Sequence, residues 1–180
     1  MTEQQLIAAC RNGEAYAQQV LFGRYCDQLF VVCIRYIPVQ ADAEEVLSDV
    51  FVQAFRSLHR FEYRGEGSFR AWITKIAVHE CLQFLRKRKA LRFTALEDTE
   101  AEQEDGQTDG MEQLQAKELL LLIHSMPAGY STVFNLYVVE GYSHKEIAAL
   151  LGISEATSKT QLMKAKAFLR KKLQTDEKRI

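Results

Sequence analysis

The sequence predicts an all-α protein made of two small helical domains joined by a flexible acidic linker. Apolar residues recur three and four positions apart in both halves, no alternation of period two is sustained, and the 180 residues include only two prolines. The segment over 92–111 is acidic, contains Gly106 and Gly110, and has too little apolar surface to offset the entropy of ordering it. We therefore predict a first domain over 1–91 and a second over 112–180.

The composition is that of an ordinary globular protein and excludes a membrane-spanning chain. The longest apolar run, Leu29–Ile34, is far shorter than the ~20 residues of a membrane helix. The N-terminus shows no basic segment followed by an apolar one, so we expect no secretory signal and a cytoplasmic protein. The four cysteines form no C-x-x-C pair and predict free thiols rather than disulfides or a metal site.

The net charge of −1 conceals two basic halves. The segment from Phe93 to Ala116 contains eight acids and neither Lys nor Arg. The rest of the chain has 23 basic and 16 acidic residues, a formal charge of +7. Two basic domains on either side of an acidic segment indicate a polyanionic partner.

The first domain is predicted to contain four helices, over about 2–12, 14–37, 41–59 and 68–90. The third has one apolar stripe, and its acids lie on nearly the opposite side, a pattern that by itself is typical of a solvated face. These acids are Asp42, Glu45 and Asp49.

The loop over 61–68 and the helix that follows it carry the polar groups of this domain. Two glycines in the loop allow close approach of the backbone to a nucleic-acid base, and two aromatic rings could stack on one. Ser68 is a good N-cap for the fourth helix. That helix has a polar face made of Lys75, His79, Gln83 and Arg86.

The most specific local pattern lies at 141–173 and predicts a helix-turn-helix. Ser143 and Glu146 form a capping box at the start of its first helix. Gly152 ends that helix, because glycine best tolerates a left-handed turn, and Ser154 caps the second helix.

The second helix of this motif is predicted to turn a basic, polar face outward, as a helix in the DNA major groove does. Lysines there mostly contact phosphates, whereas hydroxyl and amide groups can read base edges. A capped helical hairpin with a solvated basic face is the other interpretation. The candidate DNA-binding residues are Ser154, Thr157, Lys159, Thr160, Gln161, Met163, Lys164 and Lys171.

Three segments carry a family resemblance. They are DAEEVLSDVF at 42–51, GSFRAWI at 67–73, and GYSHKEIA at 141–148 with LGISEAT at 151–157. In this order and at this spacing they resemble regions 2.2, 2.3–2.4 and 4.2 of the extracytoplasmic-function sigma factors of bacterial RNA polymerase. The resemblance implies a region 2 domain, a linker and a region 4 domain, which together direct the polymerase to promoters.

The resemblance also implies partners. The third helix would dock on the coiled coil of the polymerase's largest subunit, and the second domain would meet the flap of the second largest subunit. Promoter DNA and an anti-sigma factor are the other implied partners, whereas no cofactor, metal or small-molecule substrate is implied. The implied docking residues are Asp42, Glu45, Asp49, Val50 and Phe51.

In this family the loop before the fourth helix captures a base flipped from the non-template strand of the −10 element, and the helix-turn-helix binds the −35 element. Trp72 is interpreted as core packing rather than as a wedge between strands. His79 and Gln83 stand where the family commonly has Asn and Asp or Asn, and both keep hydrogen-bonding groups. The implied −10 residues are Tyr63, Arg64, Gly67, Ser68, Lys75, His79, Gln83, Arg86, Lys87 and Arg88.

A transcriptional regulator with an N-terminal sensing or dimerisation domain is the alternative function. It explains the helix-turn-helix, but neither the acidic helix nor the basic end of the first domain. An enzyme is not predicted, because the four histidines have no ligand spacing and the sequence has no nucleophile elbow or phosphate-binding loop.

Overall fold

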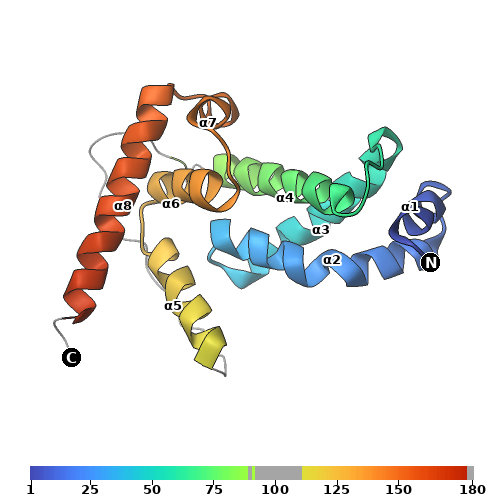
Figure 1. Cartoon of the computed structure of the whole chain (residues 1–180), viewed down its shortest axis with the longest axis horizontal. Coiled ribbons are helices and arrows are strands. Elements are labelled where there is room, and N and C mark those ends of the chain that lie inside the picture. The colour runs from blue at the N-terminus through green and yellow to red at the C-terminus, as the bar shows by residue number, and fades with distance from the viewer. Residues whose placement is uncertain (89–90, 92–110, 178–180) are drawn as a thin grey trace. The chain divides into compact units, whose positions relative to one another are not determined.

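Figure 1 shows the computed structural model of the protein, which describes residues 1–88, 91 and 111–177. Every regular element in these residues is helical, which confirms the predicted all-α class. The chain divides into two compact units, Met1–Arg88 and Lys89–Ile180. The predicted linker falls outside the described residues except for its last residue, Met111, which begins a helix.

The first unit contains four α-helices and a short turn of 3-10 helix, called η1. The four helices predicted from the sequence are confirmed, with small differences at their ends. They are α1 (Glu3–Arg11), α2 (Ala15–Tyr36), α3 (Gln40–Ser57) and α4 (Ser68–Lys87), with η1 (Leu58–Arg60) directly after α3.

Helices α2, α3 and α4 pack on one another around a common apolar core. Leu29 of α2, Val50 of α3 and Ile73 of α4 are fully buried there. Phe69, at the start of α4, is also fully buried, and its ring centroid lies 5.4 Å from that of Phe61. This core fixes the positions of α3 and α4, the two helices that carry the predicted site residues.

Helix α1 packs against α2 and is anchored by polar contacts as well. Thr2 and Gln5 form a capping box at its start. The hydroxyl of Tyr25, on α2, donates a hydrogen bond to the carboxylate of Glu3. Burial, and then this bond to Glu3, raise the pKa of Tyr25, so the phenol stays protonated and keeps donating.

The loop before α4 closes on the side chain of Ser68. Its hydroxyl donates to the carbonyl of Gly65 (2.6 Å) and accepts from the amide of Arg64 (3.2 Å). Gly67 occupies the N-cap position with φ of +80°, a conformation that strains residues with a Cβ. The prediction that Ser68 is the N-cap was therefore wrong: Ser68 is the first residue of the helix, and its hydroxyl bonds to the loop instead.

In its described residues, the second unit contains four α-helices and a wider turn of π-helix, called η2. Helices α7 and α8 form the predicted helix-turn-helix. The elements are α5 (Met111–His124), α6 (Ala128–Phe134), η2 (Asn135–Val139), α7 (His144–Leu151) and α8 (Glu155–Glu177).

The predicted caps of the helix-turn-helix are confirmed. The Ser143 hydroxyl accepts from the Glu146 amide (3.2 Å), and the Glu146 carboxylate accepts from the Ser143 amide (2.8 Å). Gly152 ends α7 with φ of +67°, and the Ser154 hydroxyl accepts from the Thr157 amide (3.0 Å) at the start of α8. These local bonds fix the sharp turn between the two helices.

The helices of the second unit pack around the inner side of α8. Ile123, Met126 and Ala165 form a buried cluster in this unit. Ser158 of α8 is fully buried, and its hydroxyl shares a hydrogen bond of 2.9 Å with Nδ1 of His144, the first residue of α7. The small side chain at 158 therefore permits close contact between α7 and α8.

No helix in the part of the chain that the structure describes is long and apolar enough to cross a membrane. The four cysteines are free thiols; three are buried, and Cys26 is half-buried. Within the described residues, no group of three or more His, Cys, Asp or Glu side chains is placed to hold a metal ion.

Candidate nucleic-acid interface

One polar face of α4 is exposed along its length. Lys75, His79, Gln83 and Arg86 recur at intervals of three and four residues, and all four are exposed, as predicted. At 1.5 Å per residue they cover roughly 16 Å of the helix, which is enough to follow several nucleotides of a single strand. The face offers two cations, Lys75 and Arg86, and two further hydrogen-bonding side chains, His79 and Gln83.

A cavity of about 510 Å³ lies at the N-terminal end of α4. Part of its lining is aromatic, since Phe61 and Trp72 both line it. The ring centroids of these two residues are 5.0 Å apart. The wall also has three cationic side chains and one carboxylate. Aromatic surface with cations around it suits a base and its phosphates. The lining residues are Arg60, Phe61, Glu62, Arg64, Ser68, Ala71, Trp72 and Lys75.

The cavity contains only part of the predicted loop. Arg64, Ser68 and Lys75 line it, whereas Tyr63 and Gly67 are not among its lining residues. Arg60 lies just before the predicted loop and was not among the predicted residues. Phe61 is one of the two aromatic residues of that loop, but it was not among the predicted −10 residues.

Trp72 both packs in the core and lines this cavity. Its ring lies 5.5 Å from that of Phe69 and 5.0 Å from that of Phe61, which confirms the predicted packing role. The residue is only half-buried, and it is one of the residues that line the cavity. A base that entered the cavity could therefore meet an indole held by the core.

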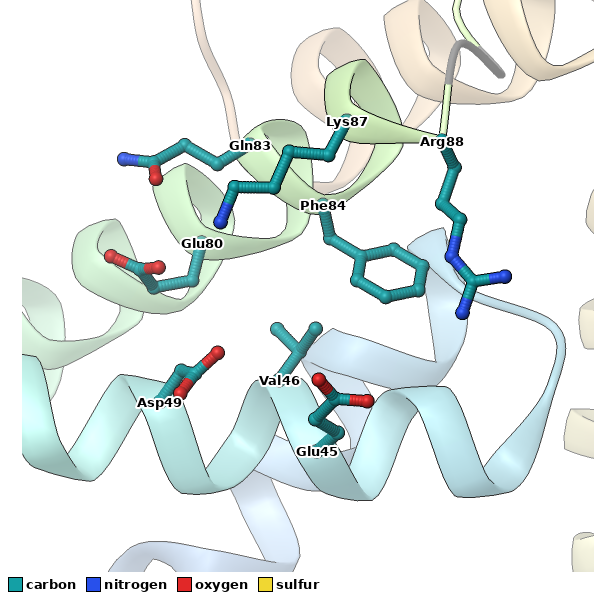
Figure 2. Close-up of a pocket in the computed structure, with 8 residues that line it drawn as sticks. All are labelled: Glu45, Val46, Asp49, Glu80, Gln83, Phe84, Lys87 and Arg88. Atoms are coloured by element: carbon teal, nitrogen blue, oxygen red, sulfur yellow. The ribbon is translucent and has the colours of Figure 1, made fainter.

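Figure 2 shows a second cavity, a groove of about 190 Å³ between α3 and α4. Glu45 and Asp49 reach it from α3, and Glu80 reaches it from α4. Predicted docking acids and predicted DNA-binding residues thus line the same groove rather than two separate surfaces. The lining residues are Glu45, Val46, Asp49, Glu80, Gln83, Phe84, Lys87 and Arg88.

Two of the predicted site residues are paired with each other at this groove. The Arg88 guanidinium lies 3.3 Å from the Asp42 carboxylate and 5.1 Å from the centroid of the Phe84 ring. The Arg88 side chain is 61% exposed, so this ion pair adds little to stability. In the free protein, therefore, Asp42, a predicted docking acid, forms an ion pair with Arg88, a predicted phosphate contact.

Glu80 is a groove residue that the sequence reasoning missed. Burial, and then the nearby charge of Asp49, raise the pKa of the Glu80 carboxyl, while Lys87 and His79 oppose this shift. Asp49 is 31 positions earlier in the chain, so no local pattern could have indicated the repulsion between the two carboxylates.

Replacing Glu80 by Gln should stabilise the protein at neutral pH. A carboxyl with a raised pKa binds its proton more tightly in the folded state, so stability is lost as pH rises through that pKa. E80Q has no charge to lose, and we expect a rise in melting temperature at pH 7 of roughly 1–3 °C. At pH 4, where Glu80 is largely protonated, the difference should nearly vanish.

Thermal denaturation followed by circular dichroism at both pH values measures this, with Glu44→Gln as the control. Glu44 is an exposed acid of α3 outside the groove. An equal gain for E80Q at pH 4 and pH 7, or a loss at pH 7, would contradict the assigned repulsion.

The structure corrects the expectation for Val50 and Phe51. Val50 is fully buried and Phe51 is 4% exposed, with its ring centroid 4.5 Å from that of Phe22. Both side chains fill the space between α3 and its neighbours, so they cannot contact a partner of the folded unit. Of the predicted docking residues, Glu45 and Asp49 are exposed and Asp42 is half-buried.

The outer face of α8 presents most of the residues predicted for duplex DNA. Lys159, Thr160, Met163 and Lys171 are exposed, and Met163 is 63% exposed. Lys164 is half-buried, with its ammonium 5.9 Å from the centroid of the Tyr130 ring. This face can place cations and a hydroxyl against a DNA groove.

Three predicted residues of this helix have structural roles. Ser154 and Thr157 share a hydrogen bond of 2.8 Å within the N-terminal cap. Gln161 is only 4% exposed, so the expectation that it faces DNA was wrong. It lies one residue before Leu162, which is also buried, and the buried side of α8 is wide because α6 packs along it as well as α7.

Two sequence families match the chain. The family described as Sigma-70 region 2 matches residues 21–91, and the family described as Sigma-70, region 4, matches residues 116–169. The ECF RNA polymerase sigma-E factor of Haemophilus influenzae is 26% identical over 185 residues, which cover 97% of this chain and 96% of the relative. The protein of the same name in Escherichia coli K12 is 26% identical over 187 residues, which cover 97% of this chain and 95% of the relative.

A solved structure has a similar fold. It is the structure of CnrH in complex with the cytosolic domain of CnrY, with a TM-score of 0.54 and 23% sequence identity. The likeness covers 97% of this chain and 98% of that chain. At 23% identity, this likeness shows a shared fold and nothing about function.

Proposed function

The chain belongs to the sigma-70 family as an extracytoplasmic-function sigma factor, which directs transcription initiation, and we propose that its two units bind separate promoter elements. In this proposal the first unit docks on core RNA polymerase and helps to open the −10 element, and the second unit binds the −35 element. Because the polymerase supplies the chemistry, the chain needs no catalytic site of its own. The proposal places it in the cytoplasm, where the polymerase acts.

The observation that carries the proposal is the cavity beside the exposed face of α4. Its aromatic wall and cationic rim suit a flipped base, whose removal from the duplex costs a few kcal/mol that stacking and phosphate contacts must offset. Lys75 lies both at the cavity and on the polar face of α4. A strand that leaves the cavity could therefore continue along that face past His79 and Gln83.

The −35 element is assigned to the outer face of α8. The capped turn between α7 and α8 is the geometry that lets a second helix enter a major groove. Lys159 and Lys171 would contact phosphates, and Thr160 would meet a base edge. In the free protein the Thr160 hydroxyl donates to the carbonyl of Ala156 (3.0 Å), so base contact would use its remaining acceptor capacity or a rotated hydroxyl.

Core polymerase is assigned to the acidic side of α3. Glu45 and Asp49 are exposed there, one turn apart, and their charge complements a basic partner such as the coiled coil of the largest subunit. The flap of the second largest subunit is the proposed partner of the second unit.

An anti-sigma factor is the further partner that we propose. The CnrH chain, which shares the fold, was solved bound to the cytosolic domain of another protein. A protein of the anti-sigma class that covered the acidic side of α3 would exclude polymerase directly. Such a partner would need basic or hydrogen-bonding groups opposite Glu45 and Asp49.

A helix-turn-helix regulator is the alternative for the second unit taken alone. The first unit disfavours it, since a cavity with three cationic side chains and an acidic helix face are features that such a regulator does not require. Transcription from a promoter library by purified core polymerase with and without the protein distinguishes the two functions. A sigma factor is required for initiation, whereas a regulator only changes it.

The two units should be separable by mutation. Thr160→Ala is expected to change base preference in the upstream element only, and His79→Ala or Gln83→Ala in the downstream element only. The change at one base position should be about tenfold, as expected for the loss of one base contact. A library randomised at both elements and transcribed by each variant holoenzyme measures this.

Glu44→Gln is the control variant in that library. Ser154 and Thr157 are unsuitable as control positions, because their side chains form the N-terminal cap of α8. If His79 and Thr160 substitutions shift the same element, the assignment of one element to each unit is wrong.

A further inference from the structure

Arg11, the last residue of α1, contacts the backbone on both sides of η1. Its Nε donates to the carbonyl of Leu58 at 3.2 Å, and its Nη2 donates to the carbonyl of Phe61. These bonds join residues 47 and 50 positions apart in the sequence. The two carbonyls face one guanidinium because η1 folds residues 58–61 into a single turn, which also has a bond from the Phe61 amide to the Leu58 carbonyl (3.1 Å).

Phe61 connects the contact with Arg11 to the cavity at the N-terminal end of α4. Its side chain is 5% exposed and lies against the rings of Phe69 and Trp72. Phe61 also lines the cavity, and the loop over 62–67 begins immediately after its carbonyl. A shift of the Phe61 backbone would therefore move both an aromatic wall and the start of the loop.

Arg11 itself does not line the cavity, and it lies before the stretch that matches region 2, which begins at residue 21. Its planar guanidinium presents two donors in a fixed arrangement, which restricts the two carbonyls more than a single flexible donor would. The contact between α1 and η1 is the route by which the N-terminal helix reaches the cavity.

We propose that Arg11 is a positioning residue for base capture: it holds the Phe61 backbone so that the aromatic wall and the loop are already formed before the strand arrives. The inference rests on the proposed function, in which this cavity receives a flipped base. Ordering the site in advance reduces the entropy lost on binding, so loosening it should weaken capture while leaving other contacts in place.

The test uses holoenzyme assembled from core polymerase and the full-length protein. The probe is forked promoter DNA, selected by the wild-type holoenzyme from a randomised library, whose downstream element is already single-stranded. Each position of that element is replaced in turn by an abasic site. The position with the largest loss for the wild type marks the captured base.

We expect Arg11→Gln to weaken binding of the intact fork about tenfold, the size of an effect from lost hydrogen bonds to a charged donor. With the abasic probe the same substitution should have little further effect, because the base that the cavity would hold is absent. Arg11→Lys, which keeps the charge and can reach a carbonyl, should lie between the two. Arg24→Gln, an exposed arginine of α2, is the matched control and should resemble the wild type on both probes.

The possible results distinguish a failure of the role proposed for Arg11 from a failure of base capture itself. If the wild type loses affinity at an abasic site but Arg11→Gln weakens both probes equally, Arg11 only supports the fold, and the inference fails while base capture stands. If no abasic site weakens the wild type, base capture itself fails. Core affinity and melting temperature are measured for each variant, and Arg11→Lys decides the case if Arg11→Gln does not fold.

Discussion

Reversing the charges of Glu45 and Asp49 together should weaken binding to core RNA polymerase by at least about 100-fold, because like charges placed against a basic partner cost several kcal/mol. Both side chains are exposed and line the groove between α3 and α4. The fold should survive: burial and then the charge of Asp49 raise the pKa of Glu80, and a lysine at 49 would replace that repulsion with an attraction.

Fluorescence anisotropy with labelled protein and purified core polymerase measures this affinity. Glu44→Lys is the matched control: at about 100° per residue it lies roughly 140° around the helix from Asp49, so it carries a reversed charge on another side of α3. Circular dichroism verifies that helical content is unchanged. Unaltered affinity in a folded double variant would remove the docking assignment.

The free protein should bind promoter duplex at least about a thousandfold more weakly than its holoenzyme does, a difference typical of non-specific against specific binding. In the first unit the cavity is proposed to take a base that is no longer in the duplex, and Arg88 is paired with Asp42. In the second unit the exposed face of one helix offers few contacts. Neither surface alone supplies the area of a specific protein–DNA interface.

Gel shifts at physiological salt, with the protein alone and with core polymerase, measure this difference on the promoter selected from the library. A scrambled promoter is the control for sequence preference. Tight, sequence-specific binding by the protein alone would favour the regulator interpretation instead. Permanganate reactivity of thymines should appear in the downstream element only with the holoenzyme.

The sequence by itself determined the four helices of the first unit and the caps of the helix-turn-helix, because those depend on local signals. The Ser143 capping box, the left-handed Gly152 and the Ser154 cap involve residues at most four positions from their partners. Apolar spacing likewise identified the exposed face of α4. The family resemblance depended on the same short segments, so regions 2 and 4 could be identified before any packing was known.

Periodicity failed where a helix has more than one packed neighbour. Periodicity gives the direction in which a side chain points from its own helix. It does not give the number of neighbouring helices that pack on that side. Gln161 was expected to face DNA, but it is buried on the side of α8 that α6 and α7 cover. For Phe51, which is buried against Phe22, the expected contact with a partner came from the family resemblance and not from periodicity.

Only the tertiary structure decided which distant residues share a site. Asp49 and Glu80 face one groove although 31 positions separate them, and Arg11 bonds to carbonyls 47 and 50 positions away. Charges and hydrogen bonds act over a few ångströms, and the packing of α1, α3 and α4 sets those distances. The sequence around Arg11 and Glu80 therefore contained no pattern that indicated their contacts.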